Sequence, residues 1–373
     1  MSGVPTVANS GLDGVIAAET VLSHVDGERG LLIVCGERIE DLAGRIGFEE
    51  LAAALWTAAG TPTTVAAARP AIGEARAAAA RLVPALLPAV AGLTPVEGLR
   101  LMLAALPDAA PMPPHILAVG AIPVFIAAQA RAARGLEALT PDPGAGHAAD
   151  FLRLLAGTPP SAAAARALDA YLVTVADHGL NASTFTARVV ASTRAGTPSA
   201  IVAALCALKG PLHGGAPGPV LDMLDEIGTP ERIEGWIEAR LAAGERLMGF
   251  GHRIYRVRDP RADVLKRAVT ELRVAGTDAE STHRLSFAEQ VEHAAHAALA
   301  RHRPGRRLDT NVEFYTALLL EALGLPRALF TPVFAMGRAA GWTAHVMEQV
   351  GTGRIIRPDS RYIGAWPRNA EAA

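Results

Sequence analysis

The sequence predicts a mainly α-helical fold, and three observations support that prediction. Apolar residues recur at three- to four-residue spacing along most of the chain, and the βαβ alternation of a parallel sheet is absent. Half of the 373 residues are hydrophobic and only 19% are charged, which is typical of a compact globular protein. The length favours two domains over one core. The net charge of −2 provides no case for binding a polyanion.

The strand signals of the N-terminal region predict a small sheet. Residues 1–11 are expected to form a loose tail. Asp26-Gly27 is a hairpin signal, and the apolar run 31–34 after it is strand-like. Residues 40–59 have apolar positions at helical spacing and are predicted to be helical.

Nine prolines from Pro70 to Pro123 are expected to divide the Ala-rich region 64–139 into short helices. The most apolar stretch, 116–130, contains Gly120 and Pro123 and predicts a buried, kinked pair of helices. Its length of about 15 residues is below the roughly 20 that a membrane span needs. The N-terminus lacks the pattern of a signal peptide, so a cytoplasmic protein is expected.

Beyond a loop at 140–144, the helical pattern resumes at about residue 149 and continues with few interruptions. The expected segments are a pair of apolar helices within 166–208, an amphipathic charged region at 262–299, apolar helices at 311–323 and 332–350, and a basic extended loop at 354–364.

Two histidines lie in similar glycine-bearing turns within the stretch 208–261. His213 lies in Gly-Pro-Leu-His-Gly-Gly, and His252 follows Gly-Phe-Gly. This repetition suggests imidazoles held at helix ends, where backbone N–H groups can tune them.

The sequence shows no clear metal-binding or redox motif among its other cysteines and histidines. Cys35 and Cys206 lie outside any metal or redox motif and are expected to be reduced core residues. Glu292-His293-Ala-Ala-His296 lacks the order of a zinc-protease motif, so it is expected to be a solvated face without a metal.

Several long motifs resemble the citrate synthase family, and they follow the family's order over nearly the whole chain. They are Asp177-His-Gly-Leu-Asn-Ala-Ser-Thr, Gly210-Pro-Leu-His-Gly-Gly, Gly249-Phe-Gly-His-Arg-Ile-Tyr, Asp259-Pro-Arg, Asn311-Val-Glu-Phe-Tyr, Phe330-Thr-Pro-Val-Phe-Ala-Met-Gly-Arg, Gly341-Trp-Thr-Ala-His and Arg357-Pro.

The resemblance implies a cytoplasmic homodimer of two-domain helical subunits. Residues 1–213 and 322–373 would form the large domain, and 214–321 the small domain that closes over the cleft. The implied reaction condenses acetyl-CoA with oxaloacetate and water to give citrate and CoA, at the entry to the tricarboxylic acid cycle. No tightly bound cofactor is implied, because the acyl-CoA is a co-substrate. No nucleic acid or membrane partner is implied.

The resemblance also assigns roles at the site. A thioester α-proton is weakly acidic, so a base needs a donor that stabilises the enol as the proton leaves. By motif position, Glu313 matches the base, His213 the enol stabiliser, and His252 the donor to the 2-oxo acid carbonyl. The matching substrate contacts are His178, Arg261, Arg338 and Arg357, with Arg357 reaching the partner subunit's site. Arg256 and Arg258 are weaker matches for CoA contacts.

Three departures from the family pattern leave alternatives open. Glu313 replaces the usual aspartate, Pro217-Gly218-Pro219 follows the first histidine turn, and Gly179 follows His178 where glutamate is usual. The extra methylene of Glu313 moves its carboxylate by about 1 Å, a scale that matters in catalysis. The alternatives are 2-methylcitrate synthesis from propionyl-CoA, a catalytically weak or inactive ligand-binding dimer, and a lyase that works in the cleavage direction.

Overall fold

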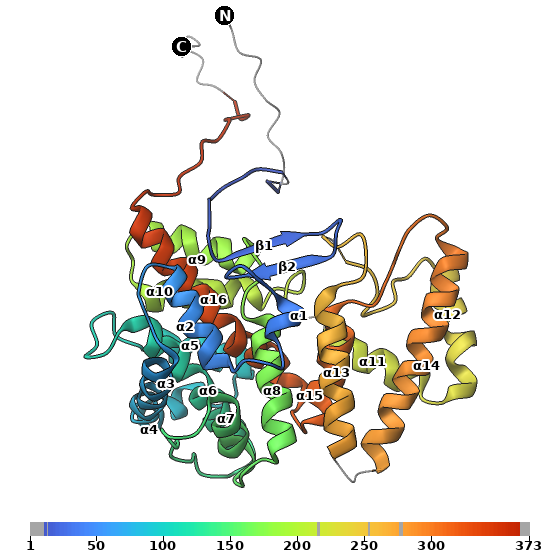
Figure 1. The fold of residues 1–373 in the computed structure, drawn as a ribbon, viewed down its shortest axis with the longest axis horizontal. Helices are drawn as coiled ribbons and strands as arrows, with labels where there is room; N and C mark the ends of the chain where they lie inside the picture. Colours follow the sequence, from blue (N-terminus) through green and yellow to red (C-terminus); the bar gives the residue numbers. More distant parts are fainter. Residues whose placement is uncertain (1–10, 13, 215–216, 253, 276–278, 366–373) are drawn as a thin grey trace, which may run out of the picture.

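The computed structural model describes residues 11–365 except 13, 215–216, 253 and 276–278, and it confirms the mainly α fold (Figure 1). The expected N-terminal tail, and Gly215 of the first histidine turn, lie outside the described residues. The longer helices of the first half are α2 (Phe48–Ala58), α3 (Val65–Ala80), α5 (Pro95–Ala104), α6 (Pro114–Ala132), α7 (His147–Ala156), α8 (Ala162–Val175), α9 (Ala182–Ser192) and α10 (Thr197–Leu208). Those of the second half are α11 (Pro217–Ile227), α12 (Ile233–Ala242), α13 (Pro260–Ala275), α14 (Ala279–His302), α15 (Val312–Ala322) and α16 (Phe330–Thr352).

The predicted small sheet is present. Strands β1 (Ser23–Asp26) and β2 (Leu31–Val34) pair antiparallel, and Asp26 lies opposite Leu31, so the predicted hairpin is confirmed. The two-residue β3 (Glu37–Arg38) pairs with β2 and leads directly into the short helix α1 (Ile39–Leu42). Gly27, in the turn, accepts a backbone hydrogen bond from Arg256 N (2.7 Å), so the hairpin contacts the loop after His252.

Proline divides the Ala-rich region as expected, with two exceptions. Pro84 and Pro88 lie in the first turns of the short helices α4 (Val83–Leu86) and η1 (Leu87–Val90), and Pro95 begins α5. Pro70 and Pro123, however, lie inside α3 and α6. The predicted helix pair at 116–130 is therefore wrong, because one continuous helix spans it. The residues around Pro123 are buried on all sides of α6, and this packing compensates for the missing backbone donor.

Within the described part of the chain, α6 is the helix with the length and apolar composition of a membrane span, but 72% of that window is buried inside the molecule. It packs against α3, α5, α7 and α16, so protein covers its apolar surface.

The expected pair of helices within 166–208 is also wrong, because three helices share this region. The break between α9 and α10 contains Arg194 and Gly196, whose φ angles are 63° and 87°. Positive φ at two nearly adjacent residues ends a right-handed helix, so α10 begins in a new direction.

Helices α11 to α15 lie together on one side of the molecule, and α2 to α10 lie on the other (Figure 1). Helix α13 packs against both α15 and α8, and α16 packs against α2, α6, α8, α9 and α10. The remaining short helices are η2 (Pro230–Arg232) and η3 (Arg327–Leu329). The domain limits at 213/214 and 321/322 stay a prediction.

Two expectations about polar and sulfur-containing side chains are corrected. Cys206 is exposed on α10, not buried in the core, because the buried face of α10 runs through other positions such as Leu205 and Leu208. Glu292 is buried, not solvated. It accepts hydrogen bonds from Thr310 and Tyr315, and His296 also contacts Thr310, so this face of α14 packs inward.

Candidate active site

Six of the sequence-predicted residues line one cavity of about 480 Å³. They come from the turns after α8 and α10, the loop before α13, and the first turns or interiors of α13, α15 and α16. These six are His178, His213, His252, Arg261, Glu313 and Arg338.

Asn311 joins the loops that carry His252 and Glu313. Its side-chain oxygen accepts from Glu313 N (3.0 Å) and so caps α15, while its amide donates to Gly251 O (2.8 Å). Its backbone N–H donates to Gly249 O (2.9 Å). One residue therefore sets the relative position of an imidazole and a carboxylate that are 61 residues apart in sequence.

His252 has a defined tautomer. Its Nδ1 accepts the backbone N–H groups of Ile254 (2.9 Å) and Tyr255 (3.1 Å), so the neutral ring carries its proton on Nε2. Arg261 Nη2 lies 3.3 Å from that Nε2, and a guanidinium group can only donate. The two shorter bonds to Nδ1 place the proton on Nε2, so the Arg261 contact joins two donors and is not a hydrogen bond in this tautomer. Burial, and next the charge of Arg261, lower the pKa of His252 to about 4, so the ring is neutral at pH 7.

Arg261 is buried and paired with Asp259. The carboxylate accepts from Nε (3.0 Å) and Nη2 (2.8 Å) in a two-point contact, and it also accepts from Val312 N (3.1 Å). Asp259 thereby joins the beginnings of α13 and α15 and balances the charge of Arg261.

His178 lies in the turn after α8, and its Nε2 is 3.1 Å from the hydroxyl oxygen of Tyr255. Its ring centroid is 6.1 Å from that of His252. Burial, followed by the charges of Arg261 and Arg338, holds the pKa of His178 well below its usual range.

His213 contacts Ser183, at the beginning of α9. Its Nε2 lies 2.8 Å from Ser183 Oγ, which accepts from Trp342 Nε1 (3.1 Å) and donates to Asn181 Oδ1 (2.8 Å). Burial lowers the pKa of His213 to about 4, with a smaller contribution from Arg338.

Arg338 is 2% exposed and has no carboxylate within salt-bridge distance among the described residues. Its Nε donates to Val175 O (2.5 Å), and the guanidinium carbon lies 4.8 Å from the centroid of the Phe334 ring. Burial lowers its pKa to about 10, which leaves the group charged at pH 7. A buried guanidinium without a directly paired carboxylate is suited to bind an anion from solution.

Glu313 is the acidic side chain in the cavity. Burial raises its pKa to about 7; Arg261 opposes this rise and Asp259 adds to it. A carboxylate with a pKa near 7 can accept a proton at neutral pH and release it again. The cavity thus combines a base whose pKa is near 7, three neutral imidazoles and three arginines, of which Arg261 and Arg338 are buried.

Arg256, Arg258 and Arg357 do not line this cavity. Arg256 is exposed, and Arg258 forms an ion pair with Asp263 (2.6 Å). Arg357 is exposed in the extended segment after α16, as expected for the basic C-terminal loop.

Sequence reasoning missed several residues of the site. Ser183, Asp259 and Tyr255 were all inside motifs that had been singled out, but nothing in a motif shows which members contact one another. Arg246 also lines the cavity, and its only sequence signal is its proximity to the second histidine turn.

A second cavity, of about 510 Å³, lies among α1, α8 and α13, and none of the predicted residues line it. Charges of both signs surround it, for example Glu40, Arg166 and Glu271. Across the described residues, no group of three His, Cys, Asp or Glu side chains is arranged to hold a metal ion.

Comparison with known families gives one description over most of the chain. Residues 11–359 match the family model for "Citrate synthase, C-terminal domain". The chain is 36% identical to a citrate synthase of Deinococcus radiodurans over 370 residues, which is 95% of each protein. It is also 36% identical to a 2-methylcitrate synthase of Mycobacterium tuberculosis H37Rv over 366 residues, covering 95% of this chain and 90% of that protein.

Solved structures agree with this result. The citrate synthase of Thermotoga maritima MSB8 superposes with a TM-score of 0.83 at 33% identity, and the match covers 98% of both chains. A Thermoplasma acidophilum citrate synthase, solved as a ternary complex with carboxymethyl coenzyme A and oxaloacetate, also gives 0.83, at 27% identity over 97% of this chain and 98% of that one.

Proposed function

The chain belongs to the citrate synthase family, and from this premise we propose that it condenses acetyl-CoA with oxaloacetate and water to give citrate and CoA. It is an enzyme of the acyltransferase type, in which the acyl group becomes an alkyl group on transfer. The observation that supports this reaction best is the grouping of one base, three neutral imidazoles and two buried arginines around one cavity.

Oxaloacetate would bind first, through its charges. Arg338 and the cavity side of Arg261 provide fixed cations for its carboxylates. His252 Nε2–H and Arg261 Nη2 converge, so an oxygen placed between them would receive two donors. Negative charge develops on the ketone oxygen as its carbon is attacked, and these donors would stabilise that charge. We assign His178 to the same substrate.

Glu313 would then remove a proton from the methyl group of acetyl-CoA. Its raised pKa makes it a stronger base than an ordinary carboxylate. His213 would donate a hydrogen bond to the thioester oxygen as the enol forms. The enol carbon then attacks the ketone carbon, and water hydrolyses the resulting thioester to release CoA.

Ser183 would set the tautomer that His213 needs. Its hydroxyl oxygen accepts from Trp342 Nε1 and lies 2.8 Å from both Asn181 Oδ1 and His213 Nε2, so its single proton, which is donated to Asn181 in the structure, would turn to His213 Nε2. The imidazole proton is then on Nδ1, which is free to donate to the thioester oxygen.

We expect Ser183→Ala to lower kcat by about 10-fold with little change in the KM of either substrate, because the fraction of His213 in the donating tautomer falls. Steady-state assays of CoA release measure both constants. Thr186→Ala, which removes an exposed hydroxyl from the same helix, is the matched control. A Ser183→Ala enzyme with unchanged kcat would contradict the assignment.

The CoA moiety would bind at the cavity mouth. Leu212 and Ile254 line the cavity but are 101% and 43% exposed, so they offer apolar surface to the pantetheine chain. Arg256 and Arg258 follow Ile254 in sequence and would meet the phosphates. We propose that residues 214–321 form the small domain, which closes over oxaloacetate and completes this site. No tightly bound cofactor is proposed, and we place the enzyme in the cytoplasm.

We propose a homodimer in which Arg357 enters the partner subunit's site. Its exposed, extended segment projects away from α16 (Figure 1). Arg357→Ala is expected to raise the KM of oxaloacetate roughly 10- to 100-fold, the scale of one charge-assisted contact.

Hybrid dimers test this exchange directly. A dimer made from one Arg357→Ala subunit and one Glu313→Gln subunit contains one site with both Glu313 and Arg357. Co-expression with two affinity tags should therefore give a dimer that combines the low KM for oxaloacetate lost in Arg357→Ala with the turnover lost in Glu313→Gln. Lack of restoration in a purified hybrid would show that Arg357 does not act across the interface.

The assay that tests the overall function measures CoA release over a panel of acyl-CoA and 2-oxo acid pairs. We expect acetyl-CoA with oxaloacetate to give the highest kcat/KM. A preference for propionyl-CoA would instead favour 2-methylcitrate synthesis. The two acyl-CoA substrates differ by one methylene, which can change kcat/KM by about 10- to 200-fold. Absence of turnover with every pair would leave a ligand-binding dimer.

A further inference from the structure

Three residues on one face of α16 contact the segment that leads into His178. Arg338 donates to Val175 O, and His345 Nε2 lies 3.0 Å from Asp177 Oδ2. Between them, Gly341 packs so closely that a Cβ there would be 2.2 Å from Ala176 O. The spacing of three and then four residues keeps these positions on one side of the helix. The contacts fix the register of α16 against residues 175–177.

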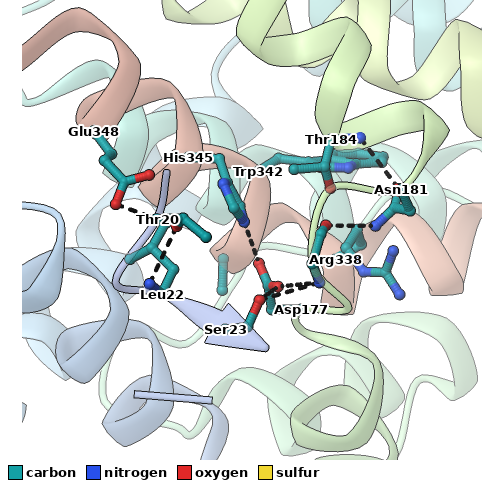
Figure 2. A network of polar contacts seen from close by, with 12 residues as sticks. Thr20, Leu22, Ser23, Asp177, Asn181, Thr184, Arg338, Trp342, His345 and Glu348 are labelled. Atoms are coloured by element: carbon teal, nitrogen blue, oxygen red, sulfur yellow. Dashed lines mark hydrogen bonds and ion pairs between the residues drawn. The ribbon is translucent and has the colours of Figure 1, made fainter. Parts of the chain in front are cut away.

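Asp177 is the centre of a buried polar network (Figure 2). Its Oδ1 accepts from the backbone N–H of Gly179 (2.9 Å) and from the hydroxyl of Ser23 on β1. Its Oδ2 faces His345. Burial alone would raise the pKa of Asp177, but His345, Ser23 and Arg338 hold it below its usual range. The turn that carries His178 is therefore held on both sides of that histidine.

His345 has one possible arrangement of protons in this network. Its Nδ1 lies 2.9 Å from Arg188 Nη1, and a guanidinium group can only donate. Nδ1 must therefore accept, and the proton of the neutral ring is on Nε2, facing Asp177. His345 is 0% exposed and thus connects a buried cation to a buried carboxylate.

The N-terminal segment completes the network. Glu348, one turn after His345, is paired with Arg188 and accepts from Thr20 Oγ1 (3.2 Å) and Val21 N (3.0 Å) (Figure 2). The chain entering β1 is thus attached to the same helix face.

We propose that His345 and Asp177 are positioning residues of the oxaloacetate site, which hold the Arg338 guanidinium and the His178 imidazole at the spacing the substrate requires. This inference rests on the proposed function and deepens it. Neither residue lines the cavity, so each acts through another residue.

The physical reason is that His345 and Arg338 compete for the carboxylate of Asp177. This buried carboxylate interacts electrostatically with Arg338, which has no directly paired carboxylate among the described residues. The imidazole of His345 lies 3.0 Å from Oδ2 without making a hydrogen bond, and as long as it covers that oxygen, the guanidinium of Arg338 is free for the substrate. Without the imidazole, this buried oxygen, which has no hydrogen-bond partner in the described part of the chain, would be open to a cation, and Arg338 would turn from the cavity towards Asp177.

The test compares His345→Leu with His345→Gln. Leucine removes both contacts, and we expect the KM and Kd of oxaloacetate to rise roughly 10- to 100-fold, the usual effect of misplacing a binding group by about 1 Å. The KM of acetyl-CoA should stay within about two-fold. Glutamine can donate to Asp177 and accept from Arg188, so we expect it to retain oxaloacetate affinity within a few-fold and an unchanged pH profile.

A purely structural role would give different results. Thr343→Val is the matched control, because Thr343 is buried on another face of α16 and accepts from Trp56 Nε1 (2.9 Å). It should lower the melting temperature without changing the KM of oxaloacetate. The proposal would be overturned if His345→Leu raised the KM of oxaloacetate and the KM of acetyl-CoA equally. It would also be overturned if neither KM changed. A glutamine variant as defective as leucine would overturn it too, since that would require the imidazole itself.

Two further measurements keep the test decisive. If His345→Leu does not fold, Ser23→Ala removes a different donor to Asp177 from a partly exposed position, and it should weaken oxaloacetate binding in the same direction. Unchanged binding in Ser23→Ala would then count against the proposal. Calorimetric Kd values separate this inference from the proposed function, because binding can be measured even in an enzyme that shows no turnover.

Discussion

Replacing Glu313 by Gln is expected to lower kcat by roughly 10²- to 10⁴-fold, the usual contribution of a general base. The amide has the size of the carboxyl group but cannot take a proton from acetyl-CoA. Because Glu313 makes no salt bridge to the described residues, its neutral replacement should leave the structure and oxaloacetate binding intact. Steady-state rates with both substrates saturating, together with a calorimetric Kd for oxaloacetate, measure the two effects separately.

The pH dependence of kcat/KM gives a second test of the same residue. The base must be ionised, and burial raises the pKa of Glu313 in the free enzyme to about 7, so kcat/KM should fall as pH decreases through about 7. The imidazoles of His213 and His252, with pKa values near 4, stay neutral over that range and add no transition. A flat profile between pH 6 and 8 would argue against Glu313 as the base.

As pH rises, the free energy of unfolding should decrease over the same range in which activity increases. The folded-state pKa of Glu313 is raised above its unfolded value of 4.5, so folding disfavours the ionised form. Stability is therefore lost as pH rises from about 4.5 to 7, and Glu313→Gln removes that loss. We expect the variant to melt at a higher temperature than the wild type at pH 8 but not at pH 4.

Glu313→Asp is the matched control for the position of the carboxylate. It restores the carboxylate but withdraws it by about 1 Å, a displacement that can cost 10²-fold where geometry is demanding. If the backbone of α15 is positioned for glutamate, the aspartate variant should be slower than the wild type. A faster Asp variant would instead show that the native glutamate limits the enzyme.

Arg338→Leu is expected to lower kcat/KM for oxaloacetate by roughly 10³-fold, about 4 kcal/mol. The side chain is buried, keeps its charge, and has no directly paired carboxylate among the described residues. Its removal therefore takes away a preorganised charge-assisted contact with the substrate carboxylate. It also leaves Asp177 with one fewer cation, so a modest decrease in melting temperature should accompany it.

Arg338→Lys distinguishes the contribution of the positive charge from that of the planar guanidinium group. Lysine restores a cation but lacks the planar fork and the Nε–H that donates to Val175 O. We expect it to recover only part of the lost affinity, with the KM of acetyl-CoA unchanged in both variants. Full activity in the lysine variant would show that charge alone suffices. Equal loss for both substrates would point to a folding defect instead.

Much of the fold was predictable because helical periodicity, caps and turns are local signals. The hairpin at Asp26-Gly27 and helices α15 and α16 follow their sequence patterns closely. Pro123 shows the limit of such reasoning: a proline usually interrupts a helix, yet burial on all sides keeps α6 continuous. The burial of Glu292 was also unpredictable from its motif, because Thr310 and Tyr315, which donate hydrogen bonds to it, lie in another segment.

By itself the sequence determined the helical class, the family resemblance and the residue types available for chemistry, since these depend on spacing along the chain. Only the tertiary structure decided which arginines share a cavity, that Glu313 has a pKa near 7, and that His252 carries its proton on Nε2. Those properties depend on burial and on partners from distant segments. The link from α16 through His345 to the turn of His178 is of this kind, because 167 residues separate the two histidines in sequence.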